Sequence, residues 1–202
     1  MAATDPNNVW RQETPGSAWP RSPQPAAANK YFMVSADCHV QEPNDFLSAR
    51  MDKKFQDRLP GIVLGGDGSK LQKTEGFRPI RIGSFTLEGE DLERSESGKT
   101  PEERLAALDR DGVDCEILFP NKGLTIWATP DVEFSQAMCR AYNDWAWETF
   151  AAYNDRMAPM ACIASADIAG AIAEGQRAAK RGFRGLSLPC KQGWGPPDPA
   201  AS

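Results

Sequence analysis

The chain has 202 residues, and its 28 acidic and 23 basic side chains give a formal net charge of −5 at pH 7. It shows neither a basic stripe of the kind that binds nucleic acid nor the roughly 20 consecutive apolar residues of a membrane span. The length predicts one domain with a sizeable core. The 5 cysteines are widely spaced and form no Cys-x-x-Cys pair, so we expect reduced thiols in a cytoplasmic protein.

The first third of the chain is irregular in composition. Residues 1–29 are rich in proline, alanine, asparagine and serine and lack the apolar segment of a secretory signal, which is typical of a disordered tail. The apolar run 31–36 has the length and the polar flanks of a buried strand. Residues 61–99 alternate short apolar runs with Gly-Gly and Asp-Gly turns, and this pattern predicts a hairpin-like insertion.

The remainder of the chain alternates regularly between helical and strand patterns. Thr100 is predicted as the N-cap of a helix that Gly112 ends, Thr129 as the N-cap of a second helix, and Asp167 as the N-cap of a third that ends at Gly182. Apolar strands are predicted between and after these helices, at residues 113–120, 156–164 and 183–189. This order predicts a parallel sheet with helical crossovers, and both a doubly wound sheet and a (β/α) barrel fit it. The third helix is expected to pack through Ile168, Ala171, Ile172 and Ala179.

The single histidine of the chain, His39, lies two residues after Asp37 at the end of the first predicted strand. Side chains alternate along a strand, so Asp37 and His39 are expected on one side and Cys38 on the other. Barrel enzymes build their active sites at the carboxyl ends of their strands. A carboxylate beside an imidazole suits a divalent ion such as Zn²⁺ or Mn²⁺, while the spacing alone also fits a capping aspartate with a stray histidine.

Four segments of the chain together resemble the amidohydrolase-related family of metal-dependent TIM-barrel hydrolases and decarboxylases, which includes aminocarboxymuconate-semialdehyde decarboxylase. They read DCHVQEP (37–43), RLAALDRDGVDCEILFPN, AYNDWAWETF and RMAPMACIASADIAGAIAEGQRAAKRGFRGLSLP. The resemblance implies an α/β fold, a partial (β/α)8 TIM barrel with about four parallel strands, helical crossovers and an insertion after the first strand. It implies a metal-dependent hydrolase or carboxy-lyase (decarboxylase) that acts on a small aromatic or cyclic carboxylic acid or amide.

The resemblance also assigns roles to individual residues. Asp37 and His39 become ligands of a divalent metal, Zn or Mn, whereas the catalytic histidine and aspartate of later strands are expected outside this chain, which has no second histidine. Glu42 is expected either near the metal or as the cap of a loop helix. Asn121 and Trp127, in the loop after the second barrel strand, are expected to contact substrate.

The same resemblance divides the chain into a tail (1–29), the N-terminal half of a TIM-barrel domain (30–189, with 61–99 as an insertion) and a loop at a truncation (190–202). A complete barrel takes about 250 residues. Half a barrel leaves open sheet edges, so the alternative hypothesis is a catalytically inactive fragment that associates through those edges. The expected partners are a small-molecule substrate and a second copy of the chain, with no nucleic acid and no membrane.

Overall fold

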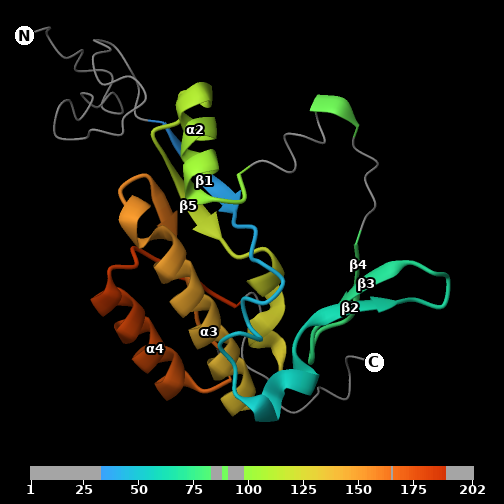
Figure 1. Ribbon diagram of the computed structural model, residues 1–202. Helices are drawn as coiled ribbons and strands as arrows, with labels where there is room; N and C mark the ends of the chain where they lie inside the picture. The colour runs from blue at the N-terminus through green and yellow to red at the C-terminus, as the bar shows by residue number, and fades with distance from the viewer. Residues whose placement is uncertain (1–32, 83–87, 91–97, 165, 190–202) are drawn as a thin grey trace, which may run out of the picture.

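The computed structural model describes residues 33–82, 88–90, 98–164 and 166–189. A parallel sheet with helices packed against it forms the body, and an antiparallel sheet projects from this body (Figure 1). The predicted disordered tail (1–29) and the predicted terminal loop (190–202) lie outside the described residues. None of the helices in the described ranges combines the length and the apolar character needed to cross a lipid bilayer.

The body is built on parallel strands, as the sequence predicted. Strand β1 (Val34–His39) pairs in parallel with β5 (Cys115–Phe119), and β5 pairs in parallel with β6 (Met157–Pro159). A second parallel pair joins β7 (Ala161–Cys162) to β8 (Leu186–Ser187). A helix lies between β1 and β5, between β5 and β6, and between β7 and β8, so the prediction of a mixed α/β fold with helical crossovers is confirmed.

The predicted strand 156–164 is divided at Met160. The Met160 N–H donates to the Leu118 carbonyl at 2.9 Å, whereas the Ala161 N–H donates to the Gly185 carbonyl at 3.0 Å. The chain therefore changes its pairing partner at this point, and one apolar run forms two short strands. The sequence pattern could not reveal this break, because it depends on which neighbouring strand supplies the acceptor.

The helices α2 (Pro101–Asp111) and α4 (Ile168–Arg181) begin and end where the sequence predicted. The side chain of Thr100 accepts a hydrogen bond from the Glu103 N–H and completes a capping box at the start of α2. Gly182 ends α4 in the left-handed conformation, with a φ of 116°. Helix α4 lies beside α3 (Val132–Phe150), as Figure 1 shows.

The start of α3 differs from its prediction. Asp131, and not Thr129, is the N-cap, because the Asp131 carboxylate accepts a hydrogen bond from the Phe134 N–H at 3.1 Å. The Thr129 hydroxyl donates instead to Glu75 at 2.7 Å. The threonine is therefore used in a contact with a distant segment, which sequence spacing cannot indicate.

The predicted packing face of α4 is wrong in part. Ile168 is 68% exposed, Ile172 is 56% exposed and Ala179 is exposed as well, so Ala171 alone of the predicted face is buried. The buried side chain in the last turns is that of Ala178. Small residues on the contact line let α4 approach the body closely. The two isoleucines lie on a face that no other element covers within the described residues.

The core lies between α3 and the parallel strands. Helix α3 buries a continuous stripe of its surface, and Trp145 and Trp147 pack in or against this core. The fully buried apolar side chains include Leu118, Phe134, Met138, Tyr142, Ala146 and Met157. Turns of 3-10 helix connect the larger elements: η2 (Lys53–Arg58), η3 (Lys122–Ala128) and η4 (Ala151–Tyr153).

The predicted hairpin is confirmed as an antiparallel sheet of three strands, β2 (Gly61–Leu64), β3 (Lys70–Lys73) and β4 (Ile80–Arg81). This sheet is called the arm below. Its base is held to the body by Thr74, whose hydroxyl lies 2.8 Å from the Thr125 hydroxyl in a buried position. The assignment of residues 61–99 as an insertion in a barrel domain stays a prediction.

Candidate functional site

The carboxyl end of β1 carries the two predicted metal ligands. The Oδ1 atom of Asp37 lies 3.7 Å from the Nε2 atom of His39. The Asp37 side chain is 90% exposed and that of His39 is 40% exposed, so an ion from solvent has free access to both atoms. The side chains converge on one side of the strand, as the spacing of two residues predicted.

The imidazole of His39 is held in one orientation by the backbone. Its Nδ1 atom lies 2.7 Å from the carbonyl oxygen of Pro120, and a carbonyl only accepts hydrogen bonds, so Nδ1 is the protonated nitrogen. In the neutral ring, Nε2 is then unprotonated and its lone pair faces Asp37. A hydrogen bond from the other ring nitrogen is the usual arrangement behind a metal-bound histidine.

A β-bulge in β1 sets the direction of these side chains. The pairing with β5 shifts between Ser35 and Cys38, so β1 contains one more residue than β5 over this stretch. Ser35 and Cys38 therefore face the same side, with the hydroxyl oxygen and the thiol sulfur 2.9 Å apart. The Cys38 side chain packs against the core, and burial raises the pKa of its thiol, so this cysteine faces away from the pair as predicted.

The pair fits part of a metal site. Bonds of about 2.1 Å from one ion to a histidine nitrogen and a carboxylate oxygen can span up to about 4.2 Å, which is more than the observed separation of Asp37 and His39. Within the described ranges, no group of three or more His, Cys, Asp and Glu side chains is arranged to hold an ion. A catalytic ion generally has three protein ligands, so the described residues provide an incomplete set.

Glu42 organises the loop that follows β5. Its side chain is buried, at 2% exposure, and its carboxylate accepts hydrogen bonds from the backbone N–H groups of Asn121 (2.9 Å), Lys122 (3.0 Å) and Gly123 (3.0 Å). These are N–H groups at the start of η3, so Glu42 caps a loop helix, which is one of its two predicted roles. The role near a metal stays a prediction.

Lys122 strengthens the same connection and was missed from the sequence. Its ammonium group donates to the Glu42 carbonyl at 2.6 Å and to the Asn44 side-chain oxygen at 2.8 Å. The loop after β1 and the loop after β5 are thereby joined side by side at the carboxyl ends of their strands. The only signal for Lys122 was its position directly after a strand, and that signal does not single out one residue.

The two predicted substrate contacts lie in different surroundings. Asn121 is exposed at the start of η3. Trp127 is 7% exposed, its indole N–H donates to the Leu124 carbonyl at 2.8 Å, and its ring packs edge-on against Phe77. The structure therefore places Asn121 where a ligand can reach it and Trp127 in the core beneath the arm.

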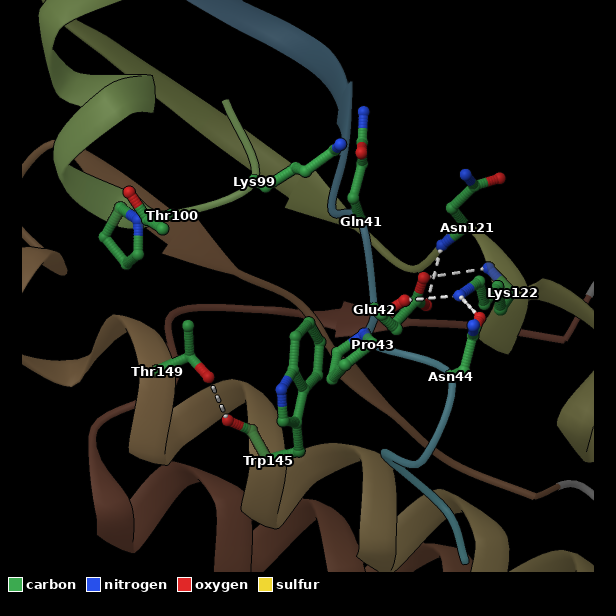
Figure 2. A pocket seen from close by; sticks show the side chains of 11 residues that line it. Gln41, Glu42, Pro43, Asn44, Lys99, Thr100, Asn121, Lys122, Trp145 and Thr149 are labelled. Atoms are coloured by element: carbon green, nitrogen blue, oxygen red, sulfur yellow. Dashed lines mark hydrogen bonds between the residues drawn. The ribbon is translucent and has the colours of Figure 1, made fainter. Parts of the chain in front are cut away.

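A cavity of about 590 Å³ lies next to these loops. Figure 2 shows that its walls come from the loop after β1, the start of α2, the loop after β5 and the C-terminal part of α3. The residues that line it are Gln41, Glu42, Pro43, Asn44, Lys99, Thr100, Pro101, Asn121, Lys122, Trp145 and Thr149. Neither Asp37 nor His39 is among them, so the cavity adjoins the pair without containing it.

Comparisons with known proteins agree with the resemblance seen in the sequence. A family model described as Amidohydrolase matches residues 36–202. A solved amidohydrolase structure from Mycobacterium avium subsp. paratuberculosis K-10 is similar in fold, with 19% identity and a TM-score of 0.62. The match covers 80% of this chain and 50% of that one, so this chain spans half the length of the solved relative.

A second solved structure, 2,6-dihydroxybenzoate decarboxylase from Rhizobium, matches with 23% identity and a TM-score of 0.44, over 76% of this chain and 37% of that one. The comparison with curated proteins gave no match. At 19% identity, the Mycobacterium structure shows similarity of fold alone.

Proposed function

Because the chain belongs to the amidohydrolase family, whose members generally use divalent metals, we propose that it carries part of the active site of a metal-dependent hydrolase or carboxy-lyase. The observation that carries the proposal is the pair at the end of β1. Asp37 and His39 converge to 3.7 Å, and in the neutral imidazole the hydrogen bond to the Pro120 carbonyl places the proton on Nδ1 and leaves the Nε2 lone pair for an ion. This is the arrangement in which a carboxylate and an imidazole bind one ion.

The residues of this chain have defined parts in such a site. A bound Zn²⁺ or Mn²⁺ would polarise the substrate or lower the pKa of a bound water. Asp37 and His39 would hold the ion, and Pro120 fixes the ring of His39. Glu42 keeps the loop after β5 in place through its three backbone hydrogen bonds, so that Asn121 stays at the carboxyl end of the sheet.

The fold of the whole active protein is part of the proposal. The strands follow the order β1–β5–β6 and β7–β8, all pairs are parallel, and β6 and β7 belong to one run of sequence. This is the order of the first strands of a (β/α)8 barrel. We propose the same substrate class as the resemblance implied, namely a small aromatic or cyclic carboxylic acid or amide.

The proposal is tested by metal-dependent turnover. The chain is freed of metal, supplied with Mn²⁺ or Zn²⁺, and assayed for release of CO₂ from hydroxybenzoates and for cleavage of anilides. Activity that requires the ion and is lost in Asp37→Asn and His39→Gln supports the proposal. Activity that persists in both variants, or that survives a chelator, contradicts it.

The alternative, a catalytically inactive chain that associates through open edges, is favoured by a different observation. Ile168, Ile172 and Leu188 are exposed beside the edge strand β8, whose one described neighbour is β7. Exposed aliphatic side chains next to an unpaired strand edge favour association, and a second copy of this chain is the partner we propose.

The free thiols of Cys139 and Cys162 support the proposal of a reducing, cytoplasmic location.

A further inference from the structure

We propose that two copies of this chain close around a two-fold axis into one barrel, in which the partner's Asp37 and the partner's His39 complete the metal site. The inference rests on the proposed metal-binding role of Asp37 and His39. Three features of the described residues carry it: an uncovered face of the parallel sheet, two open strand edges, and a ligand set that lacks a third group.

The parallel sheet has one well-covered face and one uncovered face. On the covered face, against the core, Leu118 and Met157 are 0% exposed. The pairing register places Val34, Ile117 and Ala158 on the opposite face. There Val34 is 45% exposed, and Ile117 and Ala158 are only half-buried. Parallel sheets are generally covered on both faces, so apolar side chains on this face indicate a further layer.

The outer strands of the body are open on complementary edges. Strand β1 ends the order β1–β5–β6, and β8 pairs with β7 alone, so each has one edge without a partner among the described residues. Both strands carry exposed aliphatic side chains, Val34 on β1 and Leu186 on β8. These edges favour association with another strand.

The direction of the strands selects the arrangement of the two copies. All strand pairs of the body are parallel, so β8 of one copy continues the sheet when it pairs in parallel with β1 of the other. A two-fold axis along the strands forms this pair twice and leaves no open edge. Each copy supplies the runs β1, β5, β6–β7 and β8, so the closed ring has the strand number of a (β/α)8 barrel.

The same symmetry brings a second pair of ligands to the incomplete metal site. His39 pairs in register with Phe119, on the uncovered face, and Asp37 converges with it there. In a ring of eight strands, β1 of the second copy lies directly across the barrel from β1 of the first. The interior of such a barrel is just wide enough for side chains to fill, so groups at one height on opposite strands meet near the axis. Two carboxylates and two imidazoles make a ligand set for one Zn²⁺.

Sedimentation velocity of the full 202-residue chain, in EDTA and with Zn²⁺, tests the inference. We expect a dimer in both, with a dissociation constant that falls at least about tenfold with Zn²⁺, because an ion shared by two copies stabilises the dimer alone. Metal analysis of the isolated dimer should find one Zn²⁺ for two chains. Asp37→Asn and His39→Gln should abolish the zinc effect and keep the metal-free dimer.

A metal-free comparison tests the closed arrangement by itself. In EDTA, Val34→Lys places a charge on the uncovered face of β1 and should raise the dissociation constant at least about tenfold. Val132→Lys is the matched control, because Val132 is a 39% exposed valine at the start of α3, and it should leave the dissociation constant unchanged.

The outcomes separate this inference from the proposed function. Binding of one Zn²⁺ per chain, with association unchanged, would overturn the shared site and leave the metal-binding role of Asp37 and His39 standing. A dimer that binds no Zn²⁺ would overturn both. The two-fold barrel is also overturned if the chain stays monomeric, if it forms an open series of larger species, or if Val34→Lys associates like the wild type.

Discussion

At the scale of single residues, Glu42 contributes most to the shape of the candidate site. Its carboxylate is buried and takes three backbone N–H groups from the loop after β5, and that loop also supplies the carbonyl that orients His39. The glutamate of the motif DCHVQEP therefore positions the loop whose Pro120 carbonyl bonds to His39.

Replacing Glu42 by glutamine should destabilise the protein by about 2 kcal/mol, because the amide replaces one of the two accepting oxygens by a donor that faces backbone N–H groups. Chemical denaturation measures the loss. Glu88→Gln, at an exposed position, is the control and should change the free energy of unfolding by less than about 0.5 kcal/mol. Equal stability of both variants would show that the three hydrogen bonds contribute nothing.

Gly76 is required where the arm meets the body. Its φ is 78°, and a Cβ atom there would lie 2.1 Å from the Ala128 carbonyl oxygen. Gly76→Ala should lower the free energy of unfolding by at least about 2 kcal/mol. Gly68 has the same φ of 78° with open space around it, so Gly68→Ala reports the backbone cost alone, about 1 kcal/mol. Thermal unfolding of the two variants should therefore separate the steric contact from the conformational cost.

The sequence predicted some of these residues and not others, for a physical reason. The convergence of Asp37 and His39 follows from the alternation of side chains along one strand, which is a local property. The burial of Trp127 depends on contacts with segments far away along the chain, such as its ring contact with Phe77, and no spacing rule reports those contacts. Glu42 lies between the two cases, since a capping role was foreseen but the helix that it caps was not.

At the scale of elements, the arm is attached by an ion-pair network at its base. The guanidinium of Arg58 donates to Glu75 at 2.6 Å and to Asp131, the N-cap of α3, at 2.8 Å. It also lies over the Phe134 ring, 4.4 Å from the centroid. The hydrogen bond from Arg58 lowers the pKa of Glu75, and the hydrogen bonds from the Phe134 N–H and from Arg58 lower the pKa of Asp131.

This network should make the stability depend on pH in a defined direction. A carboxyl group with a lowered folded-state pKa stabilises the protein above its unfolded pKa, near 4 for these groups, and loses that contribution as the pH falls through the folded value. Arg58→Met should therefore melt at a lower temperature than the wild type at pH 7, and the difference should shrink as the pH approaches 3. Arg110→Met, at an exposed pair with Asp111, should show little difference at either pH. A difference for Arg58→Met that is constant with pH would contradict the assignment.

Helix boundaries matched the prediction where the predicted cap residue accepts hydrogen bonds from the first turn of its own helix. Thr100 and Asp167 do so, and α2 and α4 begin at the predicted positions, although Asp167 also accepts a hydrogen bond from Gln136 of α3. The start of α3 was wrong because Thr129 bonds to Glu75 of the arm, and the strand 156–164 was wrong because it changes partner at Met160. The errors lie where tertiary contacts compete with local pattern.

At the scale of the whole molecule, the exposed face of α4 has a measurable consequence. We expect the chain to self-associate through Ile168 and Ile172 next to strand β8. Ile172→Lys places a charge on that face and should raise the dissociation constant at least about tenfold, as measured by sedimentation velocity. Leu64→Lys changes another exposed aliphatic residue, on the arm, and is the control. A chain that stays monomeric at all concentrations, or a stronger effect of Leu64→Lys, would exclude α4 as the contact face.

The central claim, that Asp37 and His39 bind a divalent ion, is tested most directly by the chain's single histidine. With ¹⁵N in the imidazole ring, the NMR spectrum at a fixed pH near neutrality contains the two ring nitrogens of His39 and no others. Zn²⁺ should shift the Nε2 resonance while Nδ1 keeps its proton and its hydrogen bond to Pro120, and Asp37→Asn should weaken this response about tenfold or more. An unchanged Nε2 resonance at saturating Zn²⁺, or a shift that Asp37→Asn leaves intact, would contradict the claim.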